Sequence, residues 1–323
     1  MLMNLVRTKY LEQPFFLQIG SISTSYSYGG TAGGSISIPR EELPTVGIIR
    51  AVTGTLQGSY QELPTFTFTP LQGDQYFKYM LKNIELSQLV LLEHWNLGFI
   101  MNTLVERIGN TYNDPSDSNK TYENFLELAE TLSLIRQRKG IDFLYQSPIK
   151  GKSQGGYLLK LTYQHRGEAE RVETLLGISK RIEVQGGDPL IRIYRLVPAN
   201  AFVTAEEDEA GRPIIPIKLL SFMEVLSLLG QGVEVPQEHI EKGFVMVDEA
   251  FANRPSQVPM IRVRQGPGEP ENAYVTVAYR GRCFYIEDKD LLSKQIFAFL
   301  NLLFSLQSRT VMGQQPTLTI PVR

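Results

Sequence analysis

Residues 15–70 alternate between polar and apolar side chains along four short runs. A period of two is typical of β-strands whose faces meet different surroundings. Glycine or proline separates the runs, so the pattern predicts antiparallel strands in two hairpins, with a turn at Gly29-Gly30. One face carries hydroxyl and amide groups: Ser21, Ser23, Ser25, Ser27, Ser35, Ser37, Thr53, Thr55, Gln57 and Ser59. The other carries larger apolar side chains: Ile22, Tyr26, Tyr28, Ile36, Ile38, Val52, Leu56 and Tyr60.

From residue 71 onward, apolar residues recur at helical spacing and in short alternating stretches. Helices are predicted at 74–83, 97–108, 120–138, 167–176, 216–229 and 291–307. Strands are predicted at 141–145, 156–164, 191–197, 258–264, 273–280 and 282–287. The expected fold class is α+β, in four regions: an N-terminal helix end at 1–14, a β-hairpin region at 15–70, a helical region at 71–140, and an α+β domain at 141–323 with a C-terminal apolar helix.

The first part of the alternating region has no charged side chain. Residues 14–39 contain no charged side chain, although 20% of the chain is charged. Soluble sheets normally carry Lys, Glu or Arg on their wet face and edges. Transmembrane β-strands instead direct apolar side chains to lipid and polar ones to a lumen, over about 9–11 residues with aromatic girdles. The pattern therefore makes 15–70 a candidate transmembrane region, with the serine-bearing face lining a pore and the other face toward lipid.

Four strands do not close a barrel, and an open sheet edge is not tolerated in lipid. The membrane interpretation therefore requires a homo-oligomer whose copies share one β-barrel pore or channel in the bacterial outer membrane, with a periplasmic body at 71–323. Its partners are further copies of the chain and the lipid bilayer. The alternative is a soluble periplasmic scaffold or binding module whose Ser/Thr-rich sheet packs at a subunit interface.

Composition and motifs exclude several other functions. With 32 Lys+Arg against 34 Asp+Glu, the chain has no bulk positive charge, so no nucleic-acid partner is expected. One cysteine and three histidines leave little material for a disulfide or a metal site. Gly151-Lys152-Ser153 lacks the upstream glycine of a phosphate-binding loop, and no Gly-x-Ser-x-Gly elbow occurs. We therefore expect a protein that is not an enzyme, with no catalytic residues, no metal and no cofactor.

Short motifs near the start of the chain, in the stretch 64–73 and near its end carry a resemblance. They are Asn4-Leu5-Val6-Arg7 and Pro14-Phe15-Phe16-Leu17, the stretch 64–73 (PTFTFTPLQG), and Tyr279-Arg280-Gly281 with Tyr285-Ile286-Glu287-Asp288 and Leu303-Phe304-Ser305-Leu306. These motifs resemble a family of lipoprotein-like bacterial envelope proteins to which no activity is assigned. The resemblance implies an envelope location and an upstream export segment. The expected architecture is also similar to oligomeric outer-membrane secretion channels such as the curli exporter, an analogy of architecture alone.

Overall fold

The computed structural model describes residues 1–35, 53–70, 74–91, 95–116, 121–148, 155–178, 190–199, 206–246, 261–308 and 318–321. The chain divides into two compact units. A hairpin unit contains residues 15–71 and 313–323, and a body unit contains residues 1–14 and 72–312. The hairpin unit is thus inserted after the first helix of the body, and the C-terminal segment returns to it.

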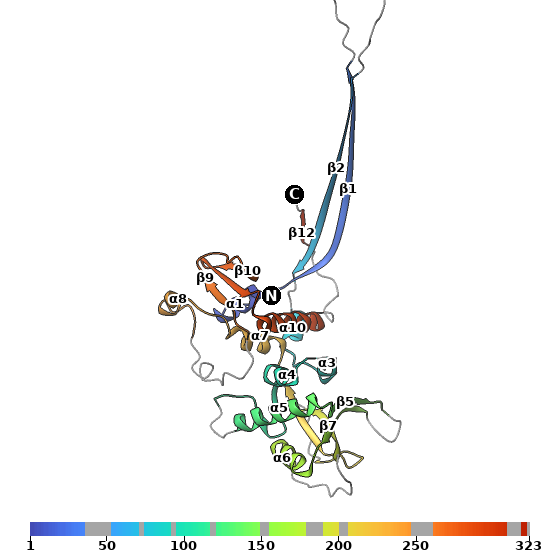
Figure 1. Ribbon diagram of the computed structural model, residues 1–323, viewed down its shortest axis with the longest axis vertical. Helices are drawn as coiled ribbons and strands as arrows, with labels where there is room; N and C mark the ends of the chain where they lie inside the picture. Colours follow the sequence, from blue (N-terminus) through green and yellow to red (C-terminus); the bar gives the residue numbers. More distant parts are fainter. Residues whose placement is uncertain are drawn as a thin grey trace, which may run out of the picture. The chain divides into compact units, whose positions relative to one another are not determined.

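The hairpin unit is built on two long strands, β1 (Leu17–Ser35) and β2 (Thr53–Pro70), which pair antiparallel along their length. A short strand, β12 (Leu318–Pro321), pairs antiparallel with the other edge of β2 (Figure 1). The predicted turn at Gly29-Gly30 is wrong, since β1 continues through it and Gly30 lies opposite Gly58. Glycine fits a strand as well as a turn. Ser27 and Ser35 lie on the same face only when the strand continues without a break between them.

The body contains a sheet of six strands, in the order β4-β3-β8-β7-β6-β5. Their bounds are β3 Val105–Ile108, β4 Thr111–Tyr112, β5 Ile141–Gln146, β6 Gly156–Tyr163, β7 Leu190–Pro198 and β8 Ile214–Leu219. Neighbouring strands are antiparallel except for β7 and β8. The helices α4 (Leu97–Leu104), α5 (Thr121–Gln137) and α6 (Arg166–Leu176) pack on this sheet and on one another. The predicted apolar stripe of α5 is confirmed, because Phe125, Leu128, Leu132 and Ile135 are buried.

Two predicted helices are shorter than expected because part of each is a strand. The helix expected at 97–108 ends at Leu104, and β3 follows. The helix expected at 216–229 is preceded by β8, and α7 (Phe222–Gly230) begins only after a capping box at Ser221 and Glu224. β3 and β8 pair with each other, so sheet hydrogen bonds outweigh the helical spacing of these short apolar runs. Residues 71–140 are therefore not a purely helical region, and β3 and β4 join the same sheet as β5–β8.

The remaining elements of the body include a three-stranded sheet in the order β10-β11-β9 and several helices. Their bounds are β9 Arg264–Gly266, β10 Ala273–Tyr279, β11 Arg282–Glu287, α1 Leu2–Lys9, α2 Asp74–Leu81, α3 Leu86–Leu91, α8 Gln237–Glu241 and α10 Leu291–Ser308. Helix α7 contacts α1, α2, α4 and α10, and Phe222, Phe299 and Leu300 are fully buried. The body combines helices with sheets that are largely antiparallel, which confirms the α+β class. Among the helices that the structure describes, none has both the length and the apolarity needed to cross a bilayer.

Candidate functional site

The β1–β2 hairpin carries the candidate residues of the sequence, and its register assigns them to faces. Residues directly opposite in an antiparallel pair share a face. Ser23 pairs with Thr65 and Ser35 with Thr53, so the odd-numbered positions of β1 from Ser21 to Ser35 share one face with those of β2 from Thr53 to Thr67. On that face lie the described pore-lining candidates: Ser21, Ser23, Ser25, Ser27, Ser35, Thr53, Thr55, Gln57 and Ser59. On the other lie the described lipid-facing candidates: Ile22, Tyr26, Tyr28, Leu56 and Tyr60. Ser37, Ile36, Ile38 and Val52 fall outside the described residues.

Each face also contains residues that local alternation did not single out as candidates. Gln61 and Thr67 join the polar face, opposite Ser27 and Ser21, and Thr31 joins it opposite Gln57. Phe66 joins the apolar face opposite Ile22. Alternation within each run could have identified them, but only the cross-strand register makes them one surface.

The separation of residue types is interrupted at one level of the hairpin. There Leu63 lies on the polar face, while Thr24, Glu62 and Pro64 lie on the otherwise apolar one. Immediately beyond this level, toward the end of β1, Tyr28 lies opposite Tyr60. The interruption divides the hairpin into two parts. The base runs from Leu17 to Ser23 and from Thr65 to Pro70, and the distal part runs from Ser27 to Ser35 and from Thr53 to Gln61.

At the base, β12 adds a third strand. Leu318 lies opposite Phe68 and Ile320 opposite Phe66, so two more apolar residues extend the apolar face there. The sequence contained no local signal for this pairing, because β12 lies about 250 residues away from β2 in the chain.

In the body, a polar and aromatic cluster holds the segment just before the hairpin. The Tyr10 hydroxyl lies 2.6 Å from Nδ1 of His239, and both side chains are buried. Burial lowers the pKa of His239 and raises the pKa of Tyr10 to about 12, because each ionised form would lose hydration. The Glu12 carboxylate accepts hydrogen bonds from Tyr279 and Arg280, which lower its pKa. This cluster fixes the end of α1, from which the chain enters β1.

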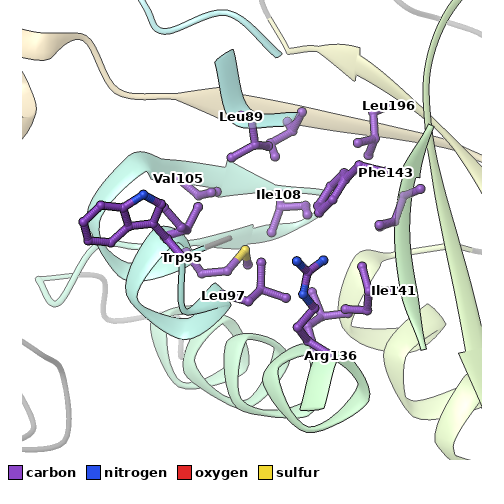
Figure 2. Close-up of a pocket in the computed structure, with 14 residues that line it drawn as sticks. Leu89, Trp95, Leu97, Val105, Ile108, Arg136, Ile141, Phe143 and Leu196 are labelled. Carbon is purple, nitrogen blue, oxygen red and sulfur yellow. The ribbon is translucent and has the colours of Figure 1, made fainter. Parts of the chain in front are cut away.

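The body also encloses an apolar cavity between α4, α5 and the six-stranded sheet. Figure 2 shows the Arg136 guanidinium directed among Leu97, Ile108 and Ile141. Arg136 supplies the one charged group among the 14 lining residues. The enclosed space is about 30 Å³, roughly the volume of one water molecule. It has neither the volume for a substrate nor a nucleophile and base, so it is a packing feature of the core.

Two of the reactive side chains of the body, His165 and Cys283, lie in regular secondary structure or at its end. His165 caps α6, where its Nδ1 accepts a hydrogen bond from the backbone N–H of Glu168 at 3.1 Å. Cys283 is a buried free thiol on β11. Gly151-Lys152-Ser153 and His94 lie outside the described residues. Within the ranges that the structure describes, no three His, Cys, Asp or Glu side chains gather as metal ligands.

Comparison with known proteins gives no relative from which a function could be transferred. No protein-family model, no curated protein and no solved structure matches the chain.

Proposed function

We propose that the protein forms a homo-oligomeric pore in the bacterial outer membrane, to which each copy contributes the β1–β2 hairpin. The observation that carries this proposal is the register of the hairpin. Strands of 19 and 18 residues keep hydroxyl and amide residues on one face and mainly apolar or glycine residues on the other. Strands of a transmembrane barrel need this arrangement, with the polar face toward the lumen.

A hairpin of this kind needs partners. A two-stranded ribbon is marginally stable in water, and three or more strands or a packed layer are normally required. Among the described residues of the hairpin unit, only the four of β12 add to it. Sharing a barrel with other copies would cover the apolar face with lipid and pair the open edges.

The length of β1 and the one acidic residue within the two strands, Glu62, suggest which part would be the membrane segment. At about 3.3 Å per residue, β1 extends about 60 Å, twice the hydrocarbon thickness of about 30 Å. Glu62 lies on the apolar face, where a carboxylate is costly inside lipid. Tyr28 and Tyr60, two pairs farther along on the same face, suit an aromatic girdle at the membrane–water interface. The distal part would therefore span the membrane, and the base with β12 would remain outside the lipid.

Planar-bilayer recording of the purified full chain tests the proposal. The expected result is stepwise conductance together with rings in electron micrographs of the detergent-purified protein. A chain that remains monomeric with and without detergent and gives no conductance would instead support the alternative of a soluble scaffold, and the pore would be abandoned.

A matched pair of variants tests the assignment of faces. Leu56 and Gln57 are neighbours on β2 with opposite register faces. Leu56 is four residues beyond Tyr60, about 10 Å below the interface if the strand tilts by about 40°. Leu56→Arg would place a cation toward lipid at a cost of about 2–4 kcal/mol in every copy, so conductance should be lost. Gln57→Arg should still conduct and shift selectivity toward anions. Equal behaviour of the two variants would contradict the proposed faces.

A further inference from the structure

The open backbone edges of the hairpin unit define where copies could pair. In the described sheet the order is β1-β2-β12, so β1 has one outer edge without a strand beside it. The outer edge of β2 is paired with β12 only from Thr65 to Phe68. The twelve residues Thr53–Pro64 therefore present their outer N–H and C=O groups without a strand partner in the described chain. Such edges pair with other strands unless they are protected.

Both edges almost entirely lack the charges with which soluble sheets protect their edges. β1 contains no charged residue, and Thr53–Pro64 contains only Glu62, near its end. Edge strands of monomeric sheets are normally blunted by lysine, inward-pointing charge or short length. Here both edges are long and almost free of charge, which suits pairing rather than exposure to water.

We propose that the outer edge of β2 from Thr53 to Pro64 pairs with β1 of a second copy, and that β12 ends this interface at the base. This inference rests on the proposed pore and specifies its subunit contact. The edge of β2 in one copy meets the edge of β1 in the next, so the contact is head-to-tail. Repeated from copy to copy, such a contact forms a closed ring when the rotation that relates neighbouring copies adds up to a full turn. Because β1 pairs antiparallel with either edge of β2, all hairpins in the ring point the same way.

The length of the free edge fits the membrane segment. Twelve residues extend about 40 Å, or about 30 Å along the membrane normal at a tilt of about 40°. The pairing thus runs through the distal part and ends near Glu62. Pro64 has no N–H to give to a ladder, and Thr65 next to it is the first residue paired with β12. A strand of the neighbour that continued toward the base would meet β12 in its path.

Cross-linking between copies tests the interface. Cys283 is the one cysteine of the chain, so Cys283→Ala provides a background without thiols. In that background Ser59→Cys lies on the free part of β2, and Thr67→Cys lies eight residues away on the same face beside β12. Each of these two β2 variants is mixed, before assembly, with a second variant whose single cysteine lies on β1. The β1 variants are Ser27→Cys, Thr31→Cys and Ser21→Cys. Because every protein holds a single thiol, any β1–β2 disulfide joins two copies.

The expected result is a disulfide-linked dimer from Ser59→Cys with Ser27→Cys or Thr31→Cys, at several times the yield from Thr67→Cys with any β1 partner. Removing residues 318–323 should raise the yield from Thr67→Cys with Ser21→Cys, because the edge beside it is then free. Equal cross-linking of Thr67→Cys and Ser59→Cys in the full chain would overturn the role of β12.

The outcome also separates this inference from the pore itself. If the Cys283→Ala protein forms rings and conducts but Ser59→Cys cross-links with no β1 position, the subunit contact lies elsewhere and this inference fails alone. If that protein neither oligomerises nor conducts, both proposals fail.

Discussion

A buried ion pair between α6 and β7 gives a quantitative prediction about the body. Glu173 Oε1 lies 3.2 Å from Nε of Arg192, and the two side chains are only 7% and 11% exposed. The same oxygen accepts a hydrogen bond of 3.1 Å from the Tyr194 hydroxyl, which lies 2.9 Å from the Tyr163 hydroxyl. Glu173 therefore joins the helix to the sheet beneath it through charge and through hydroxyl groups.

Glu173→Gln keeps the volume of the side chain and removes its charge. Removing one partner of a buried pair typically costs about 3–5 kcal/mol, because the remaining charge stays desolvated. Arg192 is 11% exposed and has a further interaction besides Glu173, so we expect the lower end, about 3 kcal/mol. The matched control is Glu127→Gln, since Glu127 pairs with Arg171 between α5 and α6 where both side chains are about half exposed. An exposed pair contributes about 0–1 kcal/mol.

Urea unfolding of the full chain, followed by tryptophan fluorescence, measures the difference. Trp95 is the one tryptophan, and its ring centroid lies 5.0 Å from that of Phe299, so its emission reports on the body. The expected order of stability is native chain, then Glu127→Gln, then Glu173→Gln. A loss below about 1 kcal/mol for Glu173→Gln, or equal losses for the two variants, would refute the reasoning from burial.

Two further predictions use the same unfolding assay. Burial lowers the pKa of His239 below its ordinary 6.5, so the stability that its neutral form contributes is complete above pH 6.5 and is lost as pH falls through the folded-state value. Between pH 7.5 and 5 the native chain should lose more stability than His239→Gln, and parallel pH profiles would contradict this. Gly109→Ala should cost more than about 2 kcal/mol, because φ is 56° and a Cβ would overlap the carbonyl oxygen of Leu176. Gly211→Ala, with φ of 70° but open space around it, should cost about 1 kcal/mol, and similar losses for both would count against the steric argument.

Local periodicity was sufficient where an element depends on its own residues. The stripe on α5 and the alternation in β6, β10 and β11 correspond to the predicted helix and strands. It failed at Val105–Ile108 and at Ile214–Leu219, where short apolar runs fit a helix and a strand equally well. The choice there depends on β3 and β8 pairing across more than 100 residues of chain, which no local window contains.

For the hairpin, the sequence alone determined which residues share a polar or an apolar face within each run, because the period of a strand is a property of its own backbone. Only the tertiary structure decided that the described parts of the four runs form one long hairpin, that Glu62 lies opposite Tyr26, and that β12 pairs with the base of β2. Pairing is a relation between distant segments, and glycine permits both a turn and a continuing strand at Gly29-Gly30. The hydrogen-bond ladder resolves that choice in favour of one continuous strand.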